Sequence, residues 1–178
     1  MTHPAIKFLN LLDRSPNATF NIECYSDVPK GAKKPQSGTI AKRFPNLTIS
    51  DVEELVPSLT KLNLQGVGIF VAVNQFHGQR DKTNLSRVRG VHADLDGVDQ
   101  HRLDAIRAIL RPTIEVQSSS PMHWHFYWLL ADGETLEAAD AESINRSLVQ
   151  FGADSAAVDV TRLLRLPGFF HMKNREVA

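Results

Sequence analysis

The sequence has a single cysteine and no excess of charge of either sign. Because Cys24 stands alone, the chain forms no internal disulfide, and a cysteine-rich zinc site is excluded. Lys and Arg together number 20, as do Asp and Glu, so the formal net charge is zero. A polyanionic partner would therefore have to meet a local cluster of basic residues instead of a chain-wide positive field.

Long apolar runs, internal repeats and low-complexity tracts are also missing from the 178 residues. No segment predicts a membrane span, and residues 1–14 form a short amphipathic pattern instead of a secretory leader. We therefore expect a cytoplasmic protein without a membrane partner. The length suffices for one domain with a sizeable core, and we predict a single domain over 1–178 with an N-terminal α/β lobe at 1–65 and a core at 66–178.

Patterns typical of helices alternate with patterns typical of strands along the chain. Helices are predicted at residues 4–14, 48–66, 99–111 and 135–152. Strands are predicted at 19–28, 67–76, 89–96 and 156–174, and a hairpin at 113–131. This mixture predicts an α+β fold with a mixed or antiparallel sheet, and not a doubly wound parallel sheet.

Three finer expectations concern the ends and surfaces of these elements. Ser50 is placed at the N-terminus of the second helix because capping residues and acids gather there. Ile109 and Leu110 are expected to face the core at the end of the third helix. Residues 29–46, rich in Pro, Gly and Lys, are expected to form a long exposed loop.

Two aspartates lie two residues apart in the apolar stretch "VRGVHADLDGV". On a strand, Asp94 and Asp96 share one face with His92, while the opposite face is apolar and can pack against the core. Carboxylates that close repel each other unless water, a cation or a basic side chain compensates. Paired carboxylates commonly hold Mg²⁺ or Mn²⁺ for phosphate chemistry, although a solvated strand end is the plainer interpretation.

Two histidines share a strand face in "SSSPMHWHFYW". A His-hydrophobic-His pattern such as His123–His125 also occurs in rolling-circle nucleases and relaxases, which cut DNA with a tyrosine downstream of the histidines. The only tyrosines here are Tyr25 and Tyr127, and none follows Tyr127. The relaxase interpretation is therefore disfavoured.

A third polar segment lies near the end of the sequence, in "GADSAAVDVTRLLRLPGFFHMKN". Arg162 and Arg165 lie three residues apart, so a regular strand would direct them to opposite faces, whereas a bend would let both reach one triphosphate. Arginine suits that ligand because its planar guanidinium binds phosphate through two hydrogen bonds. Pairing with nearby acids is the structural alternative.

Taken together, the three segments resemble the motifs of the archaeo-eukaryotic primase superfamily, and most closely its primase–polymerase branch of plasmid and phage replication primases. The first motif is matched by Asp94 and Asp96, and the second by the serine-containing turn that leads to His125. The third motif, an Asp followed by paired arginines and a Pro-Gly turn, is matched by residues 154–174. Many members have a small residue where this chain has His123, so the role of His123 stays open.

The resemblance implies a primase-like catalytic domain with an RRM-like core flanked by helices, within a longer replication protein. It implies template-directed nucleotidyl transfer on single-stranded DNA, as a primase or DNA polymerase that takes NTPs or dNTPs and uses Mg²⁺ or Mn²⁺ in a two-metal mechanism. The implied metal ligands and catalytic residues are Asp94, Asp96 and Asp154, with Asp159 as the alternative third carboxylate. The residues implied to bind the nucleotide are Ser120, His125, Arg162, Arg165 and Lys173.

Further partners and rival functions stay open at this point. The basic residues of the expected loop are a candidate for the template backbone, or a solvated linker: Lys30, Lys33, Lys34, Lys42 and Arg43. A helicase region or another replication partner is also implied by the resemblance. The rivals are a non-catalytic module that binds single-stranded DNA, which would need aromatic side chains on a basic surface, and a metal-dependent nuclease.

Overall fold

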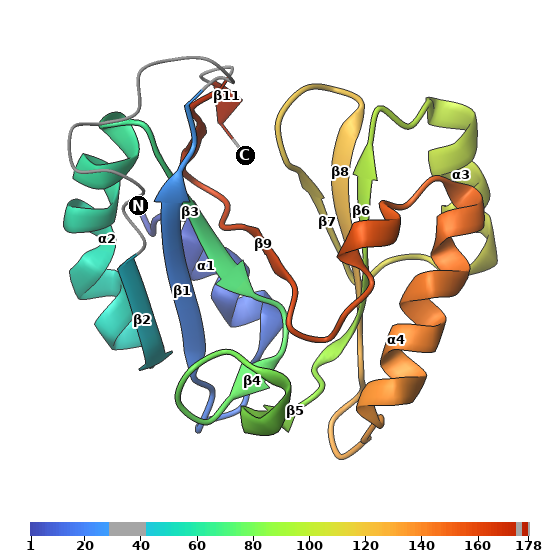
Figure 1. The fold of residues 1–178 in the computed structure, drawn as a ribbon, viewed down its shortest axis with the longest axis horizontal. Helices are drawn as coiled ribbons and strands as arrows, with labels where there is room; N and C mark the ends of the chain where they lie inside the picture. The colour runs from blue at the N-terminus through green and yellow to red at the C-terminus, as the bar shows by residue number, and fades with distance from the viewer. Residues whose placement is uncertain (29–41, 174–175, 178) are drawn as a thin grey trace.

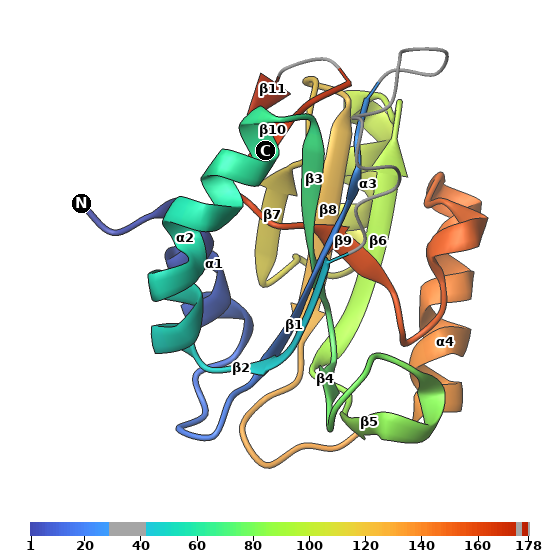
Figure 2. The ribbon, with the colours of Figure 1, turned by 60° about the vertical axis from the view of Figure 1, so that its left-hand side comes forward.

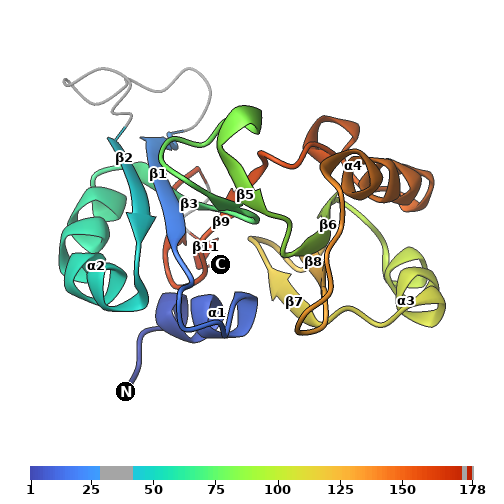
Figure 3. The same ribbon diagram turned by 90° about the horizontal axis from the view of Figure 1, so that it is seen from below.

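The computed structural model describes residues 1–28, 42–173 and 176–177. Two separate antiparallel sheets lie side by side (Figures 1 and 3). The α+β prediction is therefore confirmed. Within the described residues, no helix is long and apolar enough to span a membrane.

The first sheet has the strand order β2-β1-β3-β9. Its strands are β1 (Phe20–Ser26), β2 (Lys42–Leu47), β3 (Val67–Ala72) and β9 (Leu163–Arg165). Helices α1 (Pro4–Leu12) and α2 (Ile49–Leu64) pack on it and share one apolar core with β1 and β3. The sheet thus combines strands from both predicted parts of the chain, 1–65 and 66–178.

The second sheet has the order β6-β8-β7. Its strands are β6 (Gly90–Asp96), β7 (Ile114–Gln117) and β8 (His123–Leu129). The predicted hairpin joins β7 to β8. Helix α3 (Gln100–Ile109) packs on one face through Leu103 and Ile106, and α4 (Ala138–Ser147) contacts β6.

Short elements connect and close the two sheets. They are the hairpin β4 (Gln75–Phe76) and β5 (Leu85–Arg87), the pair β10 (Phe170–His171) and β11 (Glu176–Val177), and the 3₁₀ turns η1 (Lys82–Asn84), η2 (Leu148–Phe151) and η3 (Ser155–Ala157). The chain runs from η3 past β6 and then crosses to the first sheet as β9 (Figures 1 and 2). This crossing brings the third polar segment beside the first.

Several local predictions were wrong. Helix α2 is capped by Thr48, whose side chain and backbone exchange hydrogen bonds with Asp51, so the cap is two residues before Ser50. The end of α3 faces solvent, with Ile109 66% and Leu110 63% exposed, because the helix stops before another turn could reach the sheet.

The expected exposed loop and the expected last strand also need correction. Residues 42–47 form β2, because pairing with β1 satisfies their backbone although their side chains are mostly exposed. Lys42 and Arg43 therefore lie on a strand, whereas Lys30, Lys33 and Lys34 lie outside the described residues. Regular strand structure in 156–174 is limited to β9 and β10, since the first residues form η3 and a bend.

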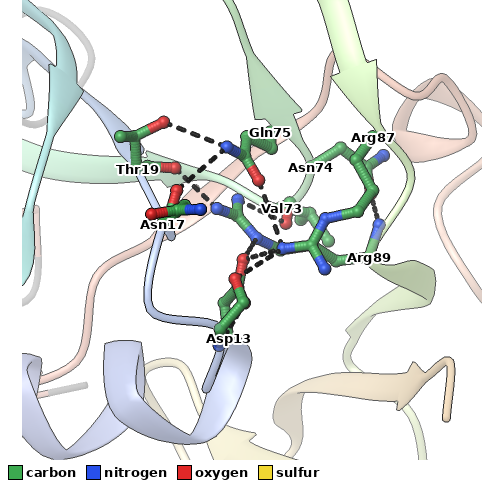
Figure 4. A network of polar contacts seen from close by, with 9 residues as sticks. Asp13, Asn17, Thr19, Val73, Asn74, Gln75, Arg87 and Arg89 are labelled. Carbon is green, nitrogen blue, oxygen red and sulfur yellow. Dashed lines mark hydrogen bonds and ion pairs between the residues drawn. The ribbon is translucent and has the colours of Figure 1, made fainter. Parts of the chain in front are cut away.

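A buried ion-pair network lies where the two sheets meet, below β3 and β6 (Figure 4). Arg89, only 4% exposed, donates from Nε to Asp13 Oδ2 at 2.7 Å and from Nη2 to the Thr19 carbonyl at 2.6 Å. Arg87 donates to the same carboxylate, and the Arg89 guanidinium lies 4.7 Å from the centre of the Phe20 ring. The end of α1, the start of β1 and the start of β6 are thereby tied together.

This network should make the protein sensitive to acid. Burial alone would raise the pKa of Asp13, but hydrogen bonds from Arg89 and Ser15 and the charge of Arg89 lower it to about 2, from 3.8. The stabilisation is therefore complete above pH 4 and is lost as the pH falls towards 2, an effect of about 2 kcal/mol. In urea denaturation at pH 5 and pH 2, Asp13→Asn should lose about 2 kcal/mol less stability on acidification than the native chain. Equal losses in both proteins would contradict this role.

Candidate active site

The β6–β8 register sets acids and histidines opposite one another. Asp94 pairs across the sheet with His125, and Asp96 with His123. The alternate residues of both strands pack against α3 in a separate apolar cluster. The polar face is therefore turned away from α3, towards the first sheet, as the spacing of the two aspartates predicts.

The connection between α4 and β9 adds a third carboxylate to this face. The backbone N–H of Asp154 donates to the Asp94 carbonyl at 2.8 Å. Arg162 Nη2 lies 3.5 Å from Asp94 Oδ2 and 3.9 Å from Asp154 Oδ2, while Nη1 donates to the Ala156 carbonyl at 3.2 Å. The first and third polar segments, about 60 residues apart in the sequence, therefore meet around one guanidinium.

The alternative third carboxylate, Asp159, is engaged elsewhere. It accepts hydrogen bonds from the backbone N–H of Thr161, at 2.9 Å, and from the Thr161 hydroxyl. These contacts close the turn before Arg162. The geometry thus brings Asp154, and not the Asp159 carboxylate, against Asp94.

Burial controls the ionisation of the site. It raises the pKa of Asp94 against the opposing charge of Arg162, and it raises the pKa of Asp96 together with the charge of Asp94. Burial, followed by the charge of Arg165, lowers the pKa of His125 to about 3, so this imidazole is neutral at physiological pH. Its Nε2 lies 3.5 Å from Asp94 Oδ1. Burial, more than the charges around them, therefore raises the pKa values of the two aspartates.

These oxygens fit a hard divalent cation. Within the described part of the chain, no three Asp, Glu, His or Cys side chains are gathered closely enough to hold an ion alone. Mg²⁺ in nucleotide-handling sites is usually bound by one or two carboxylates, with water and substrate phosphates completing its shell. Two carboxylates with raised pKa values beside a third match that donor set.

Comparison with known proteins shows the family of this chain. The family model for the RepB DNA-primase N-terminal domain matches residues 43–177. The chain belongs to this family. Its match contains all three polar segments, and the resemblance to plasmid and phage primases is confirmed.

Solved primase structures share the fold. The cyanophage S-2L primase–polymerase AEP domain has a TM-score of 0.70 and 18% identity, over 98% of this chain and 85% of its own. The catalytic domain of primase RepB′, solved in complex with initiator DNA, has a TM-score of 0.65 and 19% identity, over 97% and 79%. Primase RepB′ itself gives a TM-score of 0.65 and 19% identity over 95% of this chain, which spans 50% of that protein. No curated protein matches the chain in sequence.

The residues that the primase family implies for nucleotide binding differ in their surroundings. Arg165 is buried, and its Nη1 and Nη2 donate to the two oxygens of Asp27 at 2.9 and 3.3 Å. The hydroxyl of Ser120 is paired with Nδ1 of His123. Lys173 is exposed beyond β10. The structure therefore gathers Arg162 and His125 directly at the carboxylates, whereas no direct contact joins the other three to them among the described residues.

Several buried polar atoms on this side of the second sheet have no hydrogen-bond partner within the described residues. They are Nδ1 of His125, the hydroxyl of Tyr127 and Nε of Arg162. Buried polar atoms are nearly always paired, so three such atoms close to the carboxylates suit a face that binds a ligand or ordered water.

Sequence reasoning missed two buried carboxylates that hold arginines at the first sheet. Asp27 holds Arg165, and Glu23 accepts from Nε of Arg80 at 2.8 Å. An acid inside or just after an apolar strand is the only signal that the sequence offers for either. The arginine partner of Asp27 is 138 residues away, so only the strand order β1-β3-β9 reveals the pair.

Proposed function

We propose that the chain catalyses template-directed nucleotidyl transfer on single-stranded DNA, in primer synthesis or primer extension. The observation that carries the proposal is the meeting of Asp94 and Asp154 around Arg162, inside a chain of the primase family. The solved complex of the RepB′ catalytic domain with initiator DNA supports DNA as the template.

In the reaction, a primer 3′-oxygen attacks the α-phosphorus of a nucleoside triphosphate, and the bond to pyrophosphate breaks. Asp94, Asp96 and Asp154 would hold Mg²⁺ or Mn²⁺. The bound cations would supply positive charge at the attacking hydroxyl and at the leaving pyrophosphate. The carboxylates keep these positions fixed because two belong to a paired strand and the third is bonded to that strand through its backbone.

The cationic side chains of the site hold the triphosphate. Arg162 is 29% exposed and contacts the carboxylates only at 3.5 and 3.9 Å, so its guanidinium is accessible to phosphate oxygens. The ion pair with Asp27 fixes the direction of Arg165, which removes conformational freedom before the nucleotide binds. His125, being neutral, donates one hydrogen bond to the nucleotide without adding charge.

A matched pair of variants tests the proposal in a primer-extension assay with Mg²⁺ or Mn²⁺. Asp154→Asn should lower the rate of nucleotide incorporation about 100-fold or more, since one oxygen ligand of a catalytic cation loses its charge. Asp159→Asn should stay within about threefold, because the amide oxygen still accepts from the Thr161 N–H. Equal losses in both variants, or a loss in Asp159→Asn alone, would contradict the assignment.

A further inference from the structure

A pocket of about 110 Å³ opens on the first sheet, between β1, β2 and the turn that joins β4 to β5. Its walls include the polar side chains of Asn21 and Gln79, the apolar side chains of Phe44 and Pro45, and Arg43. None of the residues implied in nucleotide or metal binding lines it. The pocket is therefore separate from the carboxylate site.

Two asparagines build this pocket by holding the turn in place. Asn21 Nδ2 donates to the Gly78 carbonyl at 2.8 Å, and the Gly78 N–H donates to Asn46 Oδ1 at 3.0 Å. Asn46 adopts a positive φ of 56°, the one non-glycine residue to do so within the described chain. The turn is thus fixed to β1 and to β2 at once, which gives the pocket defined walls.

The Asn21 side chain is itself covered. Asn21 is 3% exposed, and its Oδ1 is buried and has no hydrogen-bond partner among the described residues, so this oxygen is not accessible to a ligand in the pocket. The contacts open to a ligand are therefore the apolar side chains of Phe44 and Pro45 and the guanidinium of Arg43.

The residues around the pocket carry a net positive charge, and one of them, Arg80, connects the pocket to the candidate active site. Glu23 is buried and is shared by Arg80, at 2.8 Å, and Arg43, at 3.4 Å, so two guanidinium groups face one carboxylate. Arg80 Nη1 also donates to the Thr161 carbonyl at 2.6 Å, next to Arg162. The side chain of Arg43 remains 58% exposed, which leaves its guanidinium accessible to an anion.

We propose that this pocket binds one unpaired nucleotide of the single-stranded DNA, a proposal that rests on the function above. The base lies against Phe44 and Pro45, and the adjacent phosphate pairs with Arg43. The pocket volume of about 110 Å³ suits a single base and excludes a second nucleotide. Contact with the face of a base does not depend on its type, so the pocket holds a base without selecting one.

The first test measures binding of a fluorescent single-stranded oligonucleotide by anisotropy, without metal or nucleotide. Arg43→Gln should weaken binding about fivefold to tenfold and reduce the slope of log K against log salt by about 0.7, the value for one lost phosphate contact on a single strand. Gln79→Trp, which fills the pocket from an exposed turn position, should also weaken binding. Arg111→Gln removes another exposed arginine, beyond α3, and should bind like the native chain.

A second series uses oligonucleotides that each lack one base. The native chain should lose affinity at one position along the strand, and Gln79→Trp should show no such position because its pocket is already filled. Native-like binding by both Arg43→Gln and Gln79→Trp would overturn the proposal, as would an oligonucleotide series without a sensitive position.

The pocket proposal and the proposed reaction can fail separately. If the native chain incorporates nucleotides but the pocket variants bind DNA normally, only the pocket proposal fails. If the pocket variants lose DNA binding while Asp94→Asn still incorporates nucleotides, the pocket proposal stands and the proposed reaction at the carboxylates fails.

Discussion

Replacing Asp94 by Asn should reduce nucleotide incorporation about 1,000-fold while leaving the fold intact. Asp94 is the carboxylate that faces His125, Arg162 and Asp154 together, so its charge is needed wherever a divalent cation meets the triphosphate. The loss of about 4 kcal/mol of transition-state stabilisation corresponds to that factor. Primer extension in Mg²⁺ and in Mn²⁺ measures it.

The stability of the same variant separates chemistry from folding. Asp94 is 9% exposed, and burial raises its pKa, so the ionised carboxylate is less favourable in the fold than in the unfolded chain at neutral pH. Asn has the same shape without that cost. Urea denaturation should give a free energy of unfolding within about 1 kcal/mol of the native value, because the substitution creates no cavity and buries no unpaired charge. If Asp94→Asn incorporates nucleotides at the native rate, or if it does not fold, Asp94 does not have the proposed role.

Replacing Arg89 by Met should be among the most destabilising single changes in the protein. Arg89 is almost fully buried, and its loss leaves the Asp13 carboxylate, itself 8% exposed, with Arg87 as its one cationic partner among the described residues. Removing one partner of a buried ion pair typically costs about 3–5 kcal/mol. Denaturation in urea at pH 7 would measure this loss directly.

Arg87 supplies the matched control for that experiment. It donates to the same carboxylate but keeps 43% of its side chain exposed, so Arg87→Met should cost about 1 kcal/mol or less. A double variant, Asp13→Leu with Arg89→Met, should recover part of the loss because no buried charge then remains. If Arg87→Met and Arg89→Met cost the same, the buried network does not join the two sheets in the way described.

The parts of the site that could be predicted from sequence are those that depend on strand periodicity. Asp94 and Asp96 share a face because side chains alternate along β6, and the same alternation places His123 and His125 on one face of β8. The α+β class follows from the same patterns. Each of these inferences needs only a few neighbouring residues.

The parts that could not be predicted depend on contacts between distant segments. Arg165 is held by Asp27, and Arg89 by Asp13, because β9 and β6 happen to lie near β1 and α1. The strand at 42–47 was missed for the same reason, since its polar residues show no alternation and its pairing with β1 is what makes it a strand.

The central claim is that this chain synthesises primers at the carboxylates of β6. The most direct measurement is primer synthesis on single-stranded DNA with labelled nucleotides and Mg²⁺ or Mn²⁺, comparing the native chain with Asp94→Asn/Asp96→Asn. We expect metal-dependent products from the native chain and none from the double variant. Products that survive in the double variant, or no products together with metal-independent retention of DNA by the native chain, would contradict it.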